Sequence, residues 1–464
     1  MTEPMEALER IVPDGWLVGG AVRDRLLDRP TEDFDVAVHG DPGRAARALA
    51  RATSAHTFKL SEGFGGWRVI ARDRRWQVDL LPLLGGSIEA DLAMRDVTIN
   101  AIAEPIGGGE FVDPFGGLDD LRRRTLRMVS RRAFVEDPLR TLRLARMSCE
   151  LGFTIEPRTM QAAGDSAAGL ADIAPERVFA ELKRIVVADG VLEGLALMDR
   201  LGATDVLLPE LAALRGIEQS RFHHLDVYAH TRAVLAETIE LERDPHRWLG
   251  EHGPAVARLL AAPLANELSR GQALRFGALL HDIAKPLTRG ITPEGRVTFI
   301  GHDEVGGDVV SAVMARLRTS ERLSEHVSAL TRHHLRLGFL VHEQPLSRRS
   351  IYRYLRACEP VQVDVTVLSV ADRLATRGSG AEVAIEKHVR LAQMMLGEAL
   401  RWVSDPPRPP LRGNELALEL GIQPGPQLGR MLAELEEASF AGELRTREEA
   451  IEHARQLLGT EQPR

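Results

Sequence analysis

The pattern of apolar residues changes character once along this chain, near residue 130. Before that point, short apolar runs at 34–38, 67–71 and 76–81 are separated by turns rich in Gly, Asp and Arg, which is typical of strands in a small mixed α/β domain. After it, Leu, Ala, Arg and Glu recur at three- and four-residue spacing, as in amphipathic helices. We therefore predict an α/β head followed by an all-α remainder.

Two interruptions divide the helical part further. A chain of 464 residues allows about three domains at roughly 150 residues each. The pattern breaks at 203–218 and again at a Pro-rich stretch, 406–410. We expect a head at 1–128, a helical neck at 129–215, a His-rich helical domain at 216–400 and a helical tail at 401–464 that forms a hairpin.

Charge and cysteine content narrow the class of protein. A net charge of -8 argues against a protein that coats nucleic acid indiscriminately, so a nucleic-acid site must be a local patch. The two cysteines, Cys149 and Cys358, are too few for a disulfide framework. No apolar stretch approaches the roughly 18 residues of a membrane span, and the first ten residues are too charged for a signal peptide. We expect a soluble cytoplasmic protein with no membrane partner.

Three acidic residues lie in the strand-like segments. Asp33 and Asp35 flank Phe34, and because strand side chains alternate, both carboxylates project from one face. Asp79 is the one acid in the run 76–80. Neighbouring carboxylates repel each other unless a cation lies between them, and Mg²⁺ prefers oxygen ligands and retains substrate phosphates. We predict a two-metal phosphoryl-transfer site with these three acids as catalytic residues.

A glycine pair precedes these acids. Gly19 and Gly20 join an apolar segment to a helical one, where backbone N–H groups can approach an anion and Arg23 can add positive charge. A tight turn without a ligand is the alternative, since isolated glycine motifs match widely.

The start of the neck combines an acidic residue, a basic residue and a basic stripe of arginines. Asp137 and Arg140 lie three residues apart after a helix start marked by Pro138, and together can satisfy the hydrogen-bonding edge of a base. The alternative is a surface ion pair that caps the helix. Nine arginines lie between Arg122 and Arg146, against four acids from Asp119 onward, a local excess of +5. Such a stripe favours phosphate binding, with a solvated helical face as the alternative.

Together these motifs resemble the class II tRNA nucleotidyltransferase and bacterial poly(A) polymerase family, which has a polymerase-beta-like head. The residues that carry the resemblance are Gly19, Gly20, Val22, Arg23 and Asp24 with Asp33 and Asp35, then Arg95, Asp96 and Asn100, then Glu136, Asp137, Arg140 and Arg143. The resemblance implies that Arg95, Asp96, Asn100, Arg143 and Arg146 help to bind the nucleotide. It also implies that Glu136, Asp137 and Arg140 select CTP or ATP in place of a nucleic-acid template. Met94 and Val97 depart from the family pattern without removing a catalytic group.

The resemblance implies a Mg²⁺-dependent enzyme that adds CCA to the 3′ end of tRNA from CTP and ATP, releasing pyrophosphate. A poly(A) polymerase is the main alternative within the same fold. Full CCA-adding members usually carry a flexible loop between the third acidic strand and the Arg-Asp motif. The segment Leu80–Ala93 is too short for that loop and lacks its basic residues. An enzyme that adds only CC, with a partner that adds the terminal A, is therefore a further alternative.

Histidines gather between residues 223 and 334, and neutral imidazole beside carboxylate suits a divalent metal. This region resembles the HD phosphohydrolase superfamily through His230, the pair His281-Asp282, and Asp372. The resemblance implies a divalent metal of uncertain identity, a second position completed by His302 and by His333 or His334, and a phosphate held by Lys285. We place His333 among the ligands. The implied activity is hydrolysis of phosphate monoesters or 2′,3′-cyclic phosphates.

In three alternative interpretations, the head, the HD domain or both are not catalytic. The HD domain can be degenerate and merely support RNA binding. The HD domain can be the working centre beside a non-catalytic RNA-binding head. The whole chain can be a non-catalytic RNA-binding module.

Overall fold

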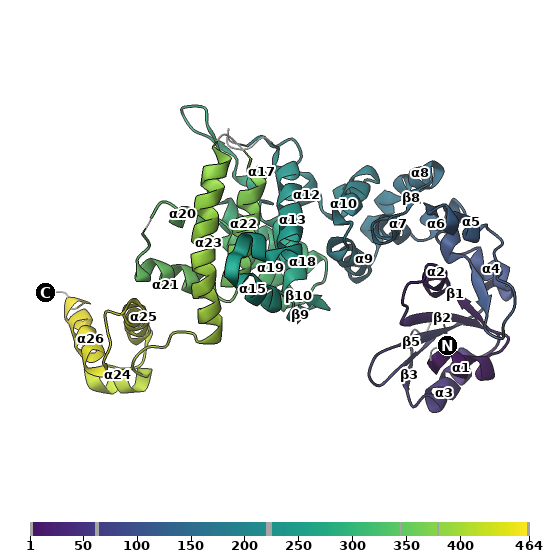
Figure 1. Cartoon of the computed structure of the whole chain (residues 1–464), viewed down its shortest axis with the longest axis horizontal. Helices are drawn as coiled ribbons and strands as arrows, with labels where there is room; N and C mark the ends of the chain where they lie inside the picture. Colours follow the sequence, from purple (N-terminus) through teal and green to yellow (C-terminus); the bar gives the residue numbers. More distant parts are fainter. Residues whose placement is uncertain (1–2, 61–64, 220–224, 344, 378–379, 462–464) are drawn as a thin grey trace. The chain divides into compact units, whose positions relative to one another are not determined.

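The computed structural model describes residues 3–60, 65–219, 225–343, 345–377 and 380–461 (Figure 1). The chain forms two compact units, Met1–Leu207 and Leu208–Arg464, which divide within the break predicted at 203–218. No helix in the described part of the chain is long and apolar enough to cross a membrane.

The first unit contains a six-stranded sheet in the order β3-β4-β5-β2-β1-β6. The three predicted runs are confirmed as β2 (Asp33–Val38), β4 (Trp67–Ile70) and β5 (Gln77–Pro82), and the other strands are β1 (Trp16–Val18), β3 (His56–Lys59) and β6 (Ala103–Pro105). Strands β2 and β5 pair in parallel, whereas every other pair in the sheet is antiparallel. The two strands that carry the predicted catalytic acids are therefore direct neighbours.

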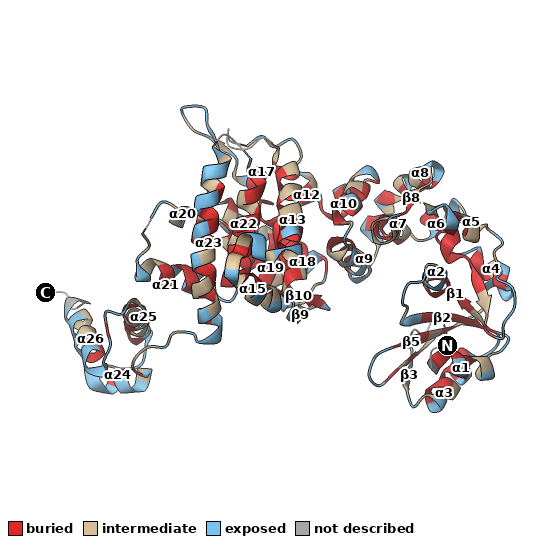
Figure 2. Ribbon diagram, in the orientation of Figure 1, coloured by how far each residue is buried: buried red, intermediate tan, exposed pale blue. Residues whose placement is uncertain are grey.

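Helices bury the apolar side chains of this sheet (Figure 2). Helix α3 (Pro42–Ala52) packs against β4 and β5, and α1 (Glu3–Ile11) packs against α3. The start of α3 is stabilised by Asp41, whose side chain accepts a hydrogen bond from the Gly43 amide at 2.8 Å. The remaining head elements are α2 (Gly20–Leu26), η1 (Leu84–Gly86), α4 (Ile88–Leu92), η2 (Thr98–Asn100), α5 (Gly117–Arg122) and β7 (Thr125–Leu126).

The predicted helical neck begins with α6 and α7. Helix α7 packs against α9 and α10, and its apolar stripe of Leu139, Leu142 and Ala145 is buried. The neck elements are α6 (Arg132–Glu136), α7 (Leu139–Leu151), β8 (Thr154–Ile155), α8 (Pro157–Asp165), η3 (Ala167–Asp172), α9 (Pro175–Val187), α10 (Val191–Arg200) and α11 (Ala203–Leu207).

The second unit is built around packed helices. Helix α13 packs against α16 and α22, α18 packs against α19, and α22 packs against α23. The helices before the tail are α12 (Pro209–Ala212), α13 (Val227–Arg243), α14 (Pro245–Leu249), η4 (Gly250–His252), α15 (Gly253–Leu260), α16 (Arg270–Leu280), α17 (Lys285–Thr288), α18 (His302–Arg316), α19 (Glu321–His333), α20 (Arg336–Leu340), α21 (Arg348–Ala357), α22 (Gln362–Ala375) and α23 (Ala381–Ser404). Two short hairpins also occur, β9 (Pro263–Ala265) with β10 (Leu268–Ser269) and β11 (Gly290–Ile291) with β12 (Val297–Thr298).

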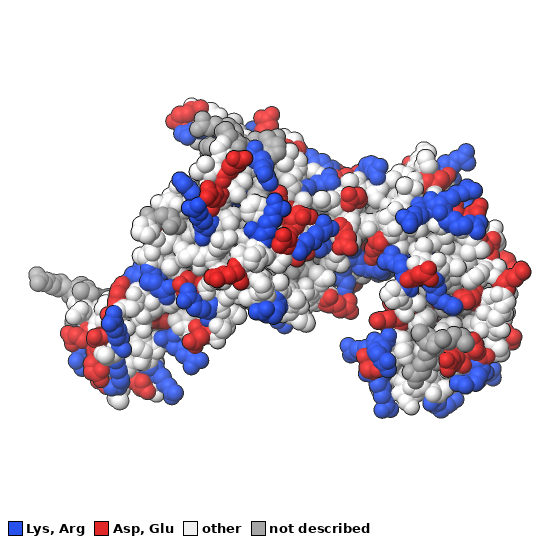
Figure 3. Space-filling model, viewed as in Figure 1, with Lys and Arg blue, Asp and Glu red and all other residues white. Residues whose placement is uncertain are grey.

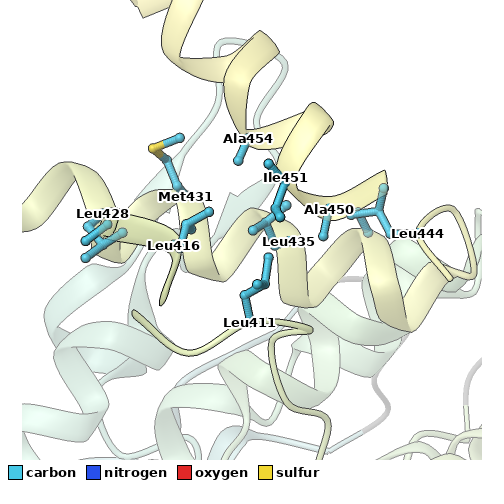
Figure 4. Packing of buried hydrophobic residues seen from close by; sticks show 11 residues of the cluster. Leu411, Leu416, Leu428, Met431, Leu435, Leu444, Ala450, Ile451 and Ala454 are labelled. Carbon is cyan, nitrogen blue, oxygen red and sulfur yellow. The ribbon is translucent and has the colours of Figure 1, made fainter. Parts of the chain in front are cut away.

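The tail contains three helices, so the prediction of a hairpin was wrong. They are α24 (Gly413–Leu420), α25 (Pro426–Ala441) and α26 (Arg447–Glu461). All three contribute to one core that includes Leu416, Leu435 and Ala450, each fully buried (Figure 4). Helix α26 buries small residues such as Ala450 and Ala454 between many charges, so its apolar pattern in the sequence is weak.

Candidate active site and metal centre

The glycine turn and the acidic strands meet in the head. Asp35 on β2 lies directly beside Asp79 on β5 in the register of the parallel pair. Gly19 precedes α2 with φ +72°, a conformation that favours glycine. A Cβ at Gly19 would lie 3.2 Å from Asp35 Oδ2 and 3.3 Å from Arg95 Nη1. The structure therefore brings Gly19, Asp35, Asp79 and Arg95 together.

The surroundings of Asp35 are unfavourable for a lone carboxylate. Burial raises the pKa of Asp35; Arg95 opposes this rise, and the charges of Asp79 and Asp33 add to it. Asp33 lies two residues earlier on the same strand and is exposed. Carboxylates gathered on neighbouring strands are the donor set that Mg²⁺ prefers, and a bound cation would relieve their repulsion. The residues present therefore fit a magnesium site in which Asp33 and Asp35 would be the ligands.

Arg68 is a neighbour of this site that the sequence analysis missed. It lies opposite Asp79 on the antiparallel pair β4–β5. Its guanidinium donates two hydrogen bonds to that carboxylate, Nε to Oδ1 at 2.7 Å and Nη2 to Oδ2 at 2.8 Å. Pairing the runs 67–70 and 77–80 as an antiparallel hairpin would have placed the two residues together. Asp79 is thus oriented by a cation of its own sheet.

A chain of hydrogen bonds links the glycine turn to the neck. Arg23 Nη1 donates to Asn100 Oδ1 at 2.8 Å, and Asn100 Nδ2 donates to Asp96 Oδ1 at 2.9 Å. Arg143 on α7 donates from Nε to Asp96 Oδ2, also at 2.9 Å. Burial alone would raise the pKa of Asp96, but the charge of Arg143 and these hydrogen bonds hold it well below its usual range. Four residues predicted to bind the nucleotide therefore form one connected network.

The residues predicted to select the nucleotide have separate partners. Asp137 accepts a hydrogen bond from Arg177 Nη2 at 2.8 Å, and Arg140 Nη2 donates to the Met94 carbonyl at 2.6 Å. Asp137 and Arg140 thus do not form the ion pair that was the alternative interpretation. Glu136 is exposed and lies 3.2 Å from Arg132.

Arg146 differs from the other predicted nucleotide-binding residues. It is buried and forms ion pairs with Glu150, at 2.6 Å, and with Glu181. These contacts hold neck helices α7 and α9 together, and the role of Arg146 in nucleotide binding stays a prediction.

The basic stripe is partly neutralised within the chain. Arg122 and Arg123 pair with Asp119, and Arg127 pairs with Asp120. Lys and Arg side chains still gather over the part of the first unit that contains α7 and α8 (Figure 3). This surface suits the phosphates of a nucleic acid.

The predicted His/Asp residues of the second unit converge on a buried cluster. His230, His281 and Asp282 form one group of potential ligands, and Asp282, His302 and His334 form another. In each group, the ligand atoms lie within 4.8 Å of one another. Asp372 joins the first group, because its Oδ1 lies 3.0 Å from His230 Nε2. Residues from α13, α22 and the ends of α16, α18 and α19 thus build one centre around Asp282.

The imidazole rings of this cluster are oriented by the backbone. The Nδ1 atoms of His281, His302 and His334 lie 2.9, 2.6 and 2.6 Å from the main-chain oxygens three residues before them. The Nε2 atoms of His281 and His302 lie 3.2 and 3.3 Å from Asp282 but form no hydrogen bond there or elsewhere in the described chain. A buried nitrogen without a partner is costly, and a metal ion is a partner that fits converging imidazole and carboxylate donors. The cluster therefore fits a divalent metal.

The structure corrects the choice of His333 as a ligand. His334 belongs to the cluster, whereas the Nδ1 atom of His333 lies 3.0 Å from Nε of Arg336. Consecutive residues at the end of a helix point about 100° apart, so only one of the two can face the centre. Burial, followed by the charge of His281, lowers the pKa of His334 to about 4, which keeps its ring neutral at physiological pH.

Lys285 lies beside the cluster, as predicted. Its Nζ atom donates hydrogen bonds to Asp282 Oδ2 at 2.6 Å and to Gln219 Oε1 at 2.7 Å. Lys285, Asp282, His334 and Asp372 line a cavity of about 910 Å³. The His/Asp cluster thus opens onto space for a ligand. His223 and His224, which belong to the predicted His-rich stretch, lie outside the described residues.

Three family models match consecutive parts of the chain. The poly(A) polymerase head domain matches residues 15–83 and 71–127. The probable RNA- and SrmB-binding site of polymerase A matches 152–214, and the HD domain matches 250–377. His230 lies before the HD match, so the family model does not cover it, and the structure places it in the cluster as the sequence analysis predicted.

The chain also resembles curated proteins over most of its length. An A-adding tRNA nucleotidyltransferase of Deinococcus radiodurans is 37% identical over 444 residues, which cover 94% of each chain. A CC-adding tRNA nucleotidyltransferase of Thermus thermophilus is 36% identical, covering 94% of this chain and 92% of the other. Fold and site together define a nucleotidyltransferase that carries an HD domain. More particularly, the chain belongs to the family of tRNA nucleotidyltransferases and poly(A) polymerases.

Solved structures support the same fold. An apo CCA-adding enzyme has a TM-score of 0.64 and 18% sequence identity, covering 98% of this chain and 92% of the other. A CCA-adding enzyme in complex with CTP has a TM-score of 0.62 and 20% identity, covering 96% and 91%.

Proposed function

We propose that the head adds two C residues to the 3′ end of tRNA from CTP and releases pyrophosphate. The observation that carries this choice is the short connection between β5 and the Arg-Asp motif. It is filled by η1 and α4, and Asp91 within it is buried, 2.8 Å from Arg95. The backbone of Leu84 also donates to Asp91 at 3.3 Å. This compact connection leaves no chain for the long flexible loop expected of full CCA-adding enzymes.

In this proposal, different residues of the head have different roles in nucleotide addition. Mg²⁺ held by Asp33 and Asp35 would lower the pKa of the attacking 3′-hydroxyl and would compensate the negative charge of the triphosphate. The glycine turn binds the phosphates, since backbone N–H groups at a helix start attract anions. Arg23, which is buried and hydrogen-bonded to Asp24 and Asn100, adds positive charge to this turn. Arg95 lies beside Asp35 and adds positive charge where pyrophosphate leaves. Asp137, which also accepts from Arg177, and Arg140, which also donates to the Met94 carbonyl, present their remaining acceptor and donor atoms to the edge of the base.

The similarity to known relatives does not indicate which nucleotides this chain adds. An A-adding and a CC-adding enzyme are 37% and 36% identical to this chain, so similarity favours neither. Addition of a terminal A is therefore the second candidate. The CC proposal implies a partner enzyme that adds the terminal A, and both reactions belong in the cytoplasm, where tRNA and nucleoside triphosphates meet.

Incorporation of labelled nucleotides separates these products. The purified protein is given tRNA that lacks CCA, or tRNA that ends in CC, with CTP, ATP or both, in Mg²⁺. We expect two C residues on the first tRNA and no extension of the second. A product ending in CCA, a single A on the CC-ended tRNA, or a run of A residues would each contradict the proposal and identify the actual enzyme.

We also propose that the second unit hydrolyses phosphate esters. The two His Nε2 atoms without hydrogen-bond partners around Asp282 favour this function over a degenerate domain. Lys285 would bind the phosphate, and a divalent metal held by the cluster would supply an activated water. Hydrolysis of 2′,3′-cyclic AMP or 3′-AMP by the wild type, and its loss in Asp282→Asn, is the test. Equal rates in the two proteins would contradict it.

A further inference from the structure

A row of ion pairs joins helix α9 to the segment 137–151, which includes helix α7. Three charged residues of α9 lie on one helix face, because they are four and three residues apart. The pairs are Arg177 with Asp137, Glu181 with Arg146, and Arg184 with Glu150. The sign of the charge alternates along both sides, so a shift by one pair would bring like charges together. The pattern therefore specifies the register of α9 against this segment.

The first pair of the row includes Asp137, which we propose reads the base. Arg177 Nη2 donates to Asp137 Oδ2 at 2.8 Å, and the amide of Leu139 donates to Oδ1 at 3.3 Å. These are two hydrogen bonds, whereas an ionised carboxylate has about four acceptor positions. The two contacts therefore orient the carboxylate and leave acceptor positions open for a ligand.

Arg177 is poorly placed to stabilise the fold. Its side chain is 53% exposed, and exposed ion pairs contribute little to stability, because water and salt screen them and ordering a long side chain costs entropy. The next pair of the row differs, since Glu181 and Arg146 are only 12% and 6% exposed. The buried pair holds α9 against α7, and what the exposed pair contributes is the orientation of Asp137.

The orientation of this acceptor decides which bases fit. The pairing edges of cytosine and adenine present an amino donor beside a ring-nitrogen acceptor, whereas uracil and guanine present a carbonyl acceptor beside an N–H donor. A carboxylate only accepts and a guanidinium only donates, so Asp137 matches the amino group and Arg140 matches the ring nitrogen. A carboxylate facing the uracil carbonyl would repel it. Discrimination against uracil thus depends on a carboxylate that cannot turn away.

We propose that Arg177 is a positioning residue that determines base specificity. It holds the carboxylate of Asp137 towards the amino group of cytosine, and it thereby excludes uracil. Arg177 acts through Asp137 and needs no contact of its own with the nucleotide. This inference rests on the proposed function, in which Asp137 presents an acceptor to the base.

The measurement is the preference for CTP over UTP, as the ratio of their kcat/KM values on tRNA that lacks CCA. Arg177→Gln should lower this ratio about tenfold, because the amino group of cytosine loses an oriented acceptor and uracil meets less repulsion. The loss for CTP should appear mainly in KM, since the base is bound before the reaction. Arg177→Lys keeps the charge without the planar fork and should restore part of the ratio. An unchanged ratio in Arg177→Gln would overturn the proposal.

Arg184→Gln is the matched control. Arg184 lies on the same face of α9, is 52% exposed, and donates two hydrogen bonds to Glu150 at 2.9 and 3.0 Å. It differs from Arg177 in its partner, which has no proposed role at the base. The buried pair of Glu181 remains in both variants, so Arg184→Gln should leave the ratio unchanged. A fall equal to that of Arg177→Gln would mean that any weakening of the contact between α7 and α9 disturbs the base site, and would overturn the proposal.

A double-mutant cycle tests whether Arg177 acts through Asp137. Asp137→Ala should itself lower the preference for CTP. Adding Arg177→Gln to Asp137→Ala should cause no further fall, because the carboxylate that Arg177 orients is already absent. A further fall as large as that of Arg177→Gln alone would show that Arg177 contacts the nucleotide directly, and would overturn its assignment as a positioning residue.

Binding without turnover separates this inference from the proposed function. The Kd values of CTP and UTP are measured in Mg²⁺ without tRNA, so that no transfer occurs. A wild type that prefers CTP, loses this preference about tenfold in Arg177→Gln, and adds no C to tRNA would keep the inference and reject the proposed function. A protein that adds C but keeps its preference in Arg177→Gln would do the reverse. Equal affinity of the wild type for CTP and UTP would reject the inference. An enzyme that adds A is tested in the same way with ATP against GTP.

Discussion

The two candidate centres of this chain are organised in opposite ways. In the head, the acidic residues lie on strands and are surrounded by cations of the same chain, such as Arg68 beside Asp79 and Arg95 beside Asp35. In the second unit, the potential ligands come from separate helices, and two of their histidine nitrogens have no hydrogen-bond partner among the described residues. The carboxylates of the head thus have cations of the chain beside them, whereas the helical cluster offers buried donors that fit a divalent metal.

The difference also concerns burial. His281, Asp282 and His334 are almost fully buried, whereas Asp33 is exposed and Asp35 and Asp79 are half-buried. Desolvated ligands gain most from a bound ion, because they have lost the water that would otherwise solvate them. A site that is open to solvent exchanges its ion more readily with each substrate. The following predictions test this contrast, from the largest expected effect to the smallest.

Asp35→Asn should reduce nucleotide incorporation by about a thousandfold, since losing a metal ligand removes several kcal/mol of transition-state stabilisation. Phosphate-ester hydrolysis should be unchanged. Asp282→Asn should have the reverse effects. Both activities are measured on the same two purified variants. If either variant loses both activities while remaining folded, the two centres are not independent.

Divalent metal should raise the thermal stability of the second unit. At a metal concentration of about 100 times Kd, binding to the folded state contributes about 2.7 kcal/mol, which corresponds to several degrees in Tm. His281→Ala should lose this shift in a thermal unfolding experiment. His333→Ala, whose side chain lies outside the cluster, is the matched control and should retain it. A shift that survives in His281→Ala would place the metal elsewhere.

Asp96→Asn should destabilise the first unit by about 2 kcal/mol, because it weakens the contacts of a buried carboxylate with the half-buried Arg143. The pKa of Asp96 is lowered in the folded protein, so its contribution is present above the unfolded pKa near 4 and is lost as the pH falls towards the folded value. Urea unfolding of both proteins at pH 7 and pH 3 is the measurement. The difference between them should shrink at pH 3, and a constant difference would contradict this assignment.

Arg68→Ala should lower kcat for nucleotide addition about tenfold with little change in KM for CTP, because the carboxylate of Asp79 loses a bidentate partner that orients it. Arg68→Lys should restore part of the rate. A change confined to KM would instead indicate that Arg68 binds the nucleotide directly.

The sequence alone predicted most of the residues that gather at the two centres. Alternation over 33–38 placed two carboxylates on one strand face, and the glycine pair marked the turn beside them, because strand period and turn chemistry are local properties of the chain. The motif order indicated the nucleotidyltransferase class, and the histidines and acids later found around Asp282 were already visible as a pattern. Helical periodicity beyond residue 130 likewise indicated an all-α remainder.

Only the tertiary structure decided which neighbours these residues have. In the structure, His334 and not His333 belongs to the cluster, and Arg68 pairs with Asp79. Asp137 and Arg140 have separate partners, and a third helix packs into the core of the tail. These facts depend on strand register and helix packing between residues far apart in the sequence. Local patterns specify which face of an element is apolar, but they do not specify which other element covers that face.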